Sequence, residues 1–181
     1  MEDRVRILDK QFVPFIPPEE IRQIVERMAG EINRDLAGKE VIFVGILNGV
    51  FIFAADLFRR IHLDARITFL RLASYQGTQS TGRVKQLIGL SEDLKDRTVV
   101  VIEDIVDTGT TLDHIIRQLN SFQPAEIRIA TLLLKPEVYH HNIPLDYVGK
   151  EIPNRFIIGY GLDYDGYGRN LEGIYVLEEN P

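Results

Sequence analysis

The sequence predicts a single α/β domain in which helices cover a parallel sheet, with a smaller strand-rich cap built from the two ends of the chain. Three observations support this fold class. Residues 41–46 and 98–102 are apolar runs without polar alternation, as expected of strands that are buried on both faces. Each run is followed by apolar residues at helical spacing. The last third of the chain carries short strand-like segments between polar turns.

The composition fits one folded domain and limits its chemistry. With 181 residues, 45% of them hydrophobic, the chain can form a full core and a small subdomain. The absence of cysteine excludes disulfides and thiolate metal sites, and it fits a reducing compartment. The chain begins with charged residues rather than with the apolar core of a signal peptide, and its longest apolar stretch, 50–55, is far short of a membrane span. We therefore expect a cytoplasmic protein with no membrane partner.

The charge argues against a nucleic-acid partner. The 27 acidic residues outnumber the 21 basic residues, which gives a formal charge of −6, and no run of Lys and Arg exceeds two residues. An acidic protein that binds a polyphosphate must supply positive charge locally, through helix termini, a few basic side chains and a metal ion.

The first part of the chain predicts alternating strands and helices. Residues 1–16 have alternating apolar positions and are expected to form an edge strand or arm. Two prolines and two acids at 17–20 indicate the start of a helix. A strand at 41–46, a turn at Leu47-Asn48-Gly49 and a second helix should follow. Further strands are expected at 66–73 and 84–90. The segment between them, 74–82, is rich in Ser, Thr, Gly and Gln, which favours a mobile loop that serves as a lid.

The second part predicts one more long strand and then several short ones. A strand at 127–134 should end at Lys135-Pro136, and shorter strands are expected at 146–149, 156–160 and 174–177. We expect a core formed by about residues 35–145 and a hood subdomain formed by residues 1–16 and 146–181.

The most informative segment is 98–112, where a β-branched run leads into carboxylates and then a hydroxyl-rich turn. Apolar residues at helical spacing follow it, so 107–111 is predicted to be a strand-to-helix turn. The first N–H groups of such a helix point outward with the positive end of its dipole, and they bind phosphate. Threonine hydroxyls add donors, and Gly109 lets the backbone come close to the anion.

Glu103 and Asp104 precede this turn and would repel a phosphate unless they bind something else on the ligand. Vicinal ribose hydroxyls are suitable donors, and a divalent cation such as Mg²⁺ would bridge carboxylate and phosphate charge. Acids beside a hydroxyl-rich turn therefore describe a ribose 5-phosphate site, formed by Glu103, Asp104, Asp107, Thr108, Gly109, Thr110 and Thr111.

Two stretches of the chain resemble a known enzyme family. The run Val-Val-Val-Ile-Glu-Asp-Ile-Val-Asp-Thr-Gly-Thr-Thr at 99–111 resembles the phosphoribosyl pyrophosphate motif of type I phosphoribosyltransferases. Lys135 and the run 148–164 are similar to the purine hood of hypoxanthine-guanine phosphoribosyltransferases. With the turn at 47–49 and Ser74-Tyr75, the resemblance covers most of residues 40–177. It implies a parallel-sheet core with a hood, and transfer of a phosphoribosyl group to a 6-oxopurine with Mg²⁺.

The resemblance also implies roles in binding the purine base. Lys135 would donate to the purine O6, and it would reject adenine, because the adenine 6-amino group would face a donor with a donor. Phe156 would stack on the base. The backbone around Ile157 and Asp163 would read the 2-position and N1. Asp107 would lie at N7 as the proton-transfer group.

The remaining roles concern the pyrophosphate end of the substrate. The resemblance implies pyrophosphate contacts from Asn48, Gly49 and Arg169, metal contacts from Glu103, Asp104 and Asp163, and a lid containing Ser74 and Tyr75. Two positions depart from the family pattern. Asn48 stands where Lys or Arg is often found, and Thr110 stands where some members carry Lys. The family usually forms homodimers or homotetramers, so a second copy of the chain is an expected partner.

Other functions remain open at this stage. Xanthine or a pyrimidine could be the acceptor in the same sugar chemistry. A regulator that kept the phosphoribosyl pyrophosphate fold and binds RNA is another possibility, which the acidic charge opposes. A nucleotide-binding subunit without catalysis is a third.

Overall fold

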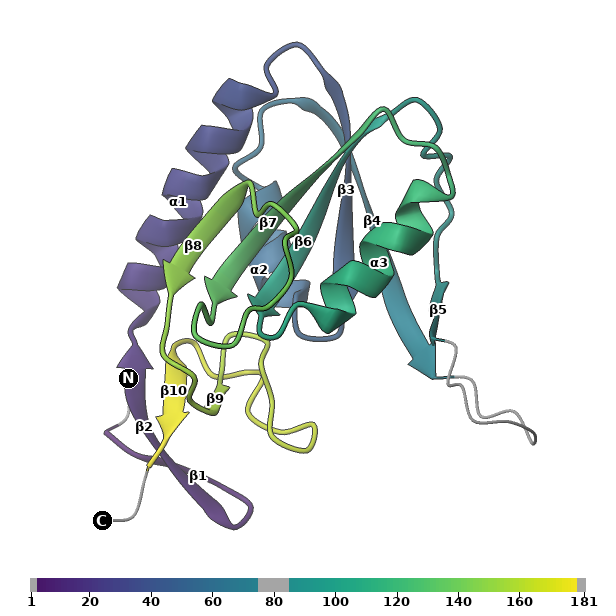
Figure 1. Ribbon diagram of the computed structural model, residues 1–181. Coiled ribbons are helices and arrows are strands. Elements are labelled where there is room, and N and C mark those ends of the chain that lie inside the picture. The colour runs from purple at the N-terminus through teal and green to yellow at the C-terminus, as the bar shows by residue number, and fades with distance from the viewer. Residues whose placement is uncertain (1–2, 75–84, 179–181) are drawn as a thin grey trace, which may run out of the picture.

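The protein consists of two β-sheets and three helices in the computed structural model, which describes residues 3–74 and 85–178 (Figure 1). In chain order the elements are β1 (Val5–Ile7), β2 (Lys10–Ile16), α1 (Pro18–Asp35), β3 (Glu40–Leu47), α2 (Phe51–Phe58), β4 (Asp64–Ser74), β5 (Lys85–Ile88), β6 (Thr98–Val106), α3 (Thr110–Asn120), β7 (Glu126–Leu134), β8 (Tyr147–Glu151), β9 (Ile157–Ile158) and β10 (Ile174–Leu177).

The larger sheet is the parallel core that the sequence predicts. Its strand order is β5-β4-β3-β6-β7-β8, and every pair from β4 to β8 is parallel, whereas β5 is antiparallel to β4. The β-branched runs of β3 and β6 are buried because helices cover both faces. One face packs under α1 and α2, and the other packs under α3. The carboxyl ends of β3, β6 and β7 consequently meet at one edge of the sheet.

Helix α1 shows why its sequence folds as predicted. Pro18 occupies the first turn, where a missing N–H is harmless, and two acids in that turn face the positive end of the helix dipole. The predicted apolar face is buried and consists of Ile21, Ile24, Val25 and Met28, together with Ala29 and Ile32. No helix within 3–74 or 85–178 combines the length and the apolar character needed to cross a membrane.

The smaller sheet is antiparallel and combines strands from both ends of the chain. Its order is β1-β2-β10-β9, and it encloses a small core of Phe12, Ile158 and Tyr175. The prediction of one edge strand or arm at residues 1–16 is wrong in detail. The chain reverses at Leu8, which has a φ of 52°, so the segment forms the β1–β2 hairpin and only β1 lies at an edge.

The predicted boundary of the hood also needs correction. We expected residues from 146 onward to join the hood, but β8 pairs in parallel with β7 in the larger sheet. Its Tyr147 is buried, and Arg27 on α1 donates to the Gly149 carbonyl at 2.5 Å. The edge of β7 is thus completed by β8, and the hood strands after the core begin at β9. The expected lid loop at 74–82 lies outside the described residues except for Ser74, the last residue of β4.

Two glycine-to-alanine substitutions should change stability in opposite directions. A Cβ at Gly149 would overlap the Leu132 carbonyl on β7, so we expect Gly149→Ala to lower the free energy of unfolding by about 1–3 kcal/mol. A Cβ at Gly30 on α1 would meet nothing within 4 Å, so Gly30→Ala should raise that free energy by about 0.5–1 kcal/mol. Urea unfolding measures both, and equal effects of the two substitutions would contradict the close approach of β8 to β7.

Candidate active site

A cavity of about 410 Å³ opens where strands β3 and β6 end. Its walls are the turn after β3, the end of β6 and the turn before α3, as expected for a ligand site at the carboxyl edge of an open α/β sheet. It is lined by Ile46, Leu47, Asn48, Gly49, Glu103, Asp104, Ile105, Val106, Asp107, Thr108, Gly109, Thr111 and Leu112. The structure therefore brings together the turn at residues 47–49, which is predicted to bind pyrophosphate and is called the pyrophosphate turn below, and all of the predicted ribose 5-phosphate residues except Thr110.

The turn between β6 and α3 has the geometry of an anion site. Gly109 is the N-cap of α3 with a φ of 88°, and a Cβ there would lie 2.6 Å from the Tyr139 ring. Glycine is required on both counts. The Thr108 hydroxyl lies 3.4 Å from the Thr110 backbone N and 3.2 Å from the Thr110 hydroxyl. The first turn of the helix thus begins at the cavity wall, with its N–H groups and positive dipole end available to a phosphate.

The two acids of β6 lie in the wall of the same cavity. Glu103 is 6% exposed, and burial together with the neighbouring Asp104 raises the pKa of its carboxyl well above the usual range. Burial raises the pKa of Asp104 to about 6, and Asp163 adds to the rise. The Ile105 N–H, 2.8 Å from Asp104 Oδ1, and the charge of Arg169 act in the opposite direction. For both acids, the hydrogen bonds and positive charges that the protein supplies do not offset the effect of burial on the ionised carboxylate.

The turn after β3 touches one of these acids directly. A Cβ at Gly49 would overlap Oδ2 of Asp104, so this position tolerates no side chain. The peptide bond between Leu47 and Asn48 is cis. Asn48 is exposed at the cavity rim.

Lys135 extends the site toward the end of β7. Its backbone N–H donates to the Val106 carbonyl at 3.0 Å, and its side chain is nearly buried. Lys135 Nζ lies 3.4 Å from Asp107 Oδ2. The two side chains expected to contact O6 and N7, which are adjacent on one edge of a purine, are thus neighbours.

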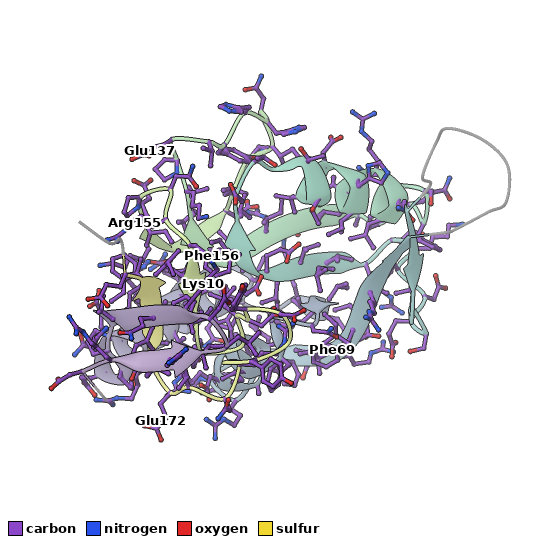
Figure 2. All side chains as sticks on the ribbon, turned by 90° about the horizontal axis from the view of Figure 1, so that it is seen from below. Lys10, Phe69, Glu137, Arg155, Phe156 and Glu172 are labelled. Carbon is purple, nitrogen blue, oxygen red and sulfur yellow. The ribbon has the colours of Figure 1, made fainter. Side chains whose placement is uncertain are left out.

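Phe156 lies in the hood, in the stretch before β9, and Figure 2 shows it between the hood strands and the end of the core sheet. Its ring is 44% exposed and rests against two other aromatic rings, with centroids 6.1 Å from Phe12 and 5.8 Å from Tyr164. An exposed ring with rigid support suits base stacking. The Ile157 side chain is buried, which leaves its backbone as the group available to a ligand.

Asp163 and Arg169 face each other on the loop between β9 and β10. Arg169 Nη2 lies 2.6 Å from Asp163 Oδ1, and Arg169 Nη1 donates to the Gly161 carbonyl at 2.6 Å. The Gly166 N–H donates to Asp163 Oδ2 at 2.7 Å. These side chains do not line the cavity described above, but both charges reach Asp104. Tyr75 lies outside the described residues.

Two residues at the site were not expected. Gly161 fits against the Gly49 carbonyl, and Tyr139 packs against Gly109 while its hydroxyl donates to the Ile143 carbonyl at 2.6 Å. No pattern in the sequence marks Tyr139. Gly161 lies within the run 148–164 that resembles a purine hood, and a glycine in that run was the sequence feature that could have indicated a close backbone contact.

The raised pKa of Asp104 gives a stability prediction with a defined sign. Folding favours the protonated carboxyl, so its contribution is complete below pH 3.8 and is lost as the pH rises through about 6. Asp104→Asn, which cannot ionise, should match wild type near pH 4 and exceed it above pH 7, by at most about 3 kcal/mol. Urea unfolding across pH without divalent cations measures this. Asp113→Asn, which removes a surface ion pair with Arg117, serves as control and should lack the trend.

Comparisons with known proteins agree with the fold and the site. The phosphoribosyl transferase domain family matches residues 18–165. A hypoxanthine-guanine phosphoribosyltransferase of Staphylococcus epidermidis is 42% identical over 165 residues, 91% of this chain and 92% of the relative. Its Staphylococcus aureus counterpart is 40% identical with the same coverage. A crystal structure of a hypoxanthine-guanine phosphoribosyltransferase from Bacillus anthracis has a TM-score of 0.82 at 34% identity, covering 91% of this chain and 96% of that chain. The protein belongs to the phosphoribosyltransferase family, as its sequence motifs predicted.

Proposed function

We propose that the protein transfers the 5-phosphoribosyl group of phosphoribosyl pyrophosphate to N9 of hypoxanthine or guanine, which yields IMP or GMP and pyrophosphate. One observation carries the proposal: paired acids and a hydroxyl-rich helix N-terminus share one cavity, and Lys135 meets Asp107 at its edge. The named relatives are hypoxanthine-guanine phosphoribosyltransferases, which supports the same choice of acceptor.

The sugar end of the substrate has a natural place in this cavity. The 5-phosphate would accept hydrogen bonds from the N–H groups of 108–111 and from the threonine hydroxyls, where the helix dipole favours negative charge. Glu103 and Asp104 would accept from the ribose hydroxyls, which would return hydrogen bonds to carboxylates that burial has deprived of water. The pyrophosphate would extend toward Asn48, Gly49 and Arg169.

The base end explains both specificity and proton transfer. Lys135 would donate to O6 of a 6-oxopurine, and adenine would leave two donors facing each other, at a cost of about 1–3 kcal/mol. When N9 bonds to the anomeric carbon of the ribose, the bond from that carbon to pyrophosphate breaks and the proton on N7 must leave. Asp107 would accept that proton. Phe156 would stack on the ring, and the backbone near Ile157 and Asp163 would read its far edge.

The donor set fits a divalent cation that is shared with the substrate. Within 3–74 and 85–178, no three His, Cys, Asp or Glu side chains form a cluster that could hold a metal ion by themselves. Mg²⁺ commonly keeps its waters and binds one or two carboxylates plus substrate phosphates. Glu103, Asp104 and Asp163 would hold the ion together with the substrate. It would neutralise charge on the pyrophosphate as that group leaves.

Several features of the proposal rest on family resemblance. Positive charge develops on the ribose in an oxocarbenium-like transition state, so water must be excluded, and a lid containing Ser74 and Tyr75 would close over the site. Asn48 offers no charge to the pyrophosphate, so binding would rest more on the Gly49 amide, Mg²⁺ and Arg169. The cytoplasmic location and the dimeric or tetrameric state remain predictions.

The substrate panel is the direct test. Purified protein with phosphoribosyl pyrophosphate and Mg²⁺ should form nucleotide from hypoxanthine and guanine. It should form none from adenine, whose 6-amino group would face the Lys135 donor, or from uracil, which has no N7 or N9. Chelation of Mg²⁺ should abolish turnover. Nucleotide formation from adenine or uracil alone would refute the role of Lys135, and undiminished turnover under chelation would refute the role of the cation.

The proton-transfer role has its own test. Asp107→Asn keeps the size of the side chain but cannot accept the proton, so kcat for hypoxanthine should fall by about 10²–10⁴. Asp113→Asn, on the outward side of the same helix start, should leave kcat unchanged. Unaltered turnover in Asp107→Asn would refute the role of Asp107 as the group that accepts the proton.

A further inference from the structure

The loop between β9 and β10 touches the pyrophosphate turn with no space between them. A Cβ at Gly161 would overlap the Gly49 carbonyl, and a Cβ at Gly49 would overlap Asp104 Oδ2. Gly161, Gly49 and Asp104 are therefore stacked in van der Waals contact, although they come from the hood, the end of β3 and β6. We call the loop between β9 and β10, residues 159–173, the hood loop. Because these groups are packed in direct contact, a shift of the hood loop must displace Gly49, which in turn must displace the Asp104 carboxylate in the cavity wall.

The residue before Gly161 fixes the loop from the other side. Tyr160 is 7% exposed and packs in the main hydrophobic cluster of the core. Its hydroxyl donates to Asp56 Oδ2 at 2.7 Å, a hydrogen bond between residues 104 positions apart. Burial and the Asp56 carboxylate hold the pKa of this phenol above its usual value, so it stays a donor at neutral pH.

Asp56 is well placed to serve as an anchor because it belongs to α2, the helix that begins just after the pyrophosphate turn. Its other carboxylate oxygen, Oδ1, accepts from Arg59, one turn further along the helix. The hydrogen bond from Tyr160 to Asp56 and the contact of Gly161 with Gly49 therefore join the same two segments of chain at two points. The Tyr160 and Gly161 N–H groups also donate within the loop, to the carbonyls of Leu171 at 2.9 Å and Arg169 at 3.0 Å.

The Tyr160 ring is packed in the core, but its hydrogen bond to Asp56 lies at the wall of a surface cavity. A cavity of about 380 Å³ lies between α1, α2 and the hood loop, and Asp56 and Tyr160 both line it. Pro18, Ile21 and Leu171 line it as well. Because this side of the loop borders an open surface cavity, removal of the hydroxyl would leave the loop free to shift toward it.

We infer that Tyr160 and Asp56 are positioning residues of the phosphoribosyl pyrophosphate half of the site, which hold the hood loop against Gly49 and so fix the pyrophosphate turn beside Asp104. The inference rests on the proposed function for its substrate, but not for its geometry. Neither residue contacts the cavity of the active site, so both act through Gly161 and Gly49.

The test is removal of one hydroxyl. Tyr160→Phe keeps the ring and its packing, and we expect the KM for phosphoribosyl pyrophosphate to rise about tenfold, equivalent to about 1.4 kcal/mol. The KM for hypoxanthine should rise less, since Lys135 at the end of β7 and Phe156, whose ring packs against Phe12, both lie outside the loop between β9 and β10. Asp56→Ala should reproduce the effect, and Asp56→Asn, which keeps an oxygen acceptor, should restore it. The double variant Tyr160→Phe/Asp56→Ala should have a KM for phosphoribosyl pyrophosphate no higher than that of either single variant.

Tyr147→Phe, at a buried phenol on β8, is the matched control and should leave both KM values unchanged.

Two outcomes would overturn the inference. An unchanged KM for phosphoribosyl pyrophosphate in Tyr160→Phe would show that the hydrogen bond does not position the turn. A fall in kcat and in the unfolding midpoint at constant KM would show that Tyr160 is structural only.

Amide hydrogen exchange separates this inference from the proposed function. In Tyr160→Phe the Tyr160 and Gly161 amides should exchange about tenfold faster than in wild type, whatever substrate the enzyme uses. Unchanged exchange overturns the anchoring role. A wild-type protein that forms no nucleotide from hypoxanthine would refute the proposed function, and the exchange result would still decide whether Tyr160 anchors the loop.

Discussion

The site depends on one constraint, which is that β3 and β6 are adjacent parallel strands. Their pairing, with Val44 opposite Val101 and Gly45 opposite Ile102, makes both strands end at the same edge. The turns that follow must then face each other across one cavity. At that edge the backbone of Gly49 lies against the Asp104 carboxylate, so direct van der Waals contact sets the distance between the turn after β3 and this acid of β6. The hood loop adds a third layer through Gly161.

The same edge concentrates charge that the fold by itself does not stabilise. Burial raises the pKa of both Glu103 and Asp104, which means that the ligand-free protein holds two carboxylates where it would favour neutral groups. Buried carboxylates with raised pKa values are common at functional sites, where the bound ligand supplies the hydrogen bonds or opposite charge that stabilise them. Ribose hydroxyls and a cation would supply the donors and the positive charge that the protein leaves out. Stability is thus lowered at the same residues that would bind substrate most strongly.

Sequence patterns predicted the centre of the fold better than its margins. The runs at 41–46 and 98–102 were recognisable because a strand buried on both faces needs continuous apolar residues. Strand β8 was assigned to the hood because an edge strand of mixed polarity does not show which sheet it joins. The residues predicted to bind ribose 5-phosphate lie close together in the sequence, at the end of β6 and in the turn after it, so a local pattern was enough to predict that they would share one site. The link from Asp56 through Tyr160 to Gly161 could not be predicted, since it joins segments far apart in the sequence and only the folded chain brings them together.

The charges of the site show how an acidic protein can accept a polyphosphate. Lys135 is close to Asp107, and Arg169 is paired with Asp163 and bonded to the Gly161 carbonyl, so each basic side chain enters the site next to an acid. Asn48 adds no charge at the pyrophosphate turn. Under the proposed function, positive potential would then come chiefly from the N-terminus of α3 and from a cation that binds with the substrate. Under that function, substrate binding would depend on the metal, because the acids that repel a bare pyrophosphate are the groups that would bind its magnesium complex.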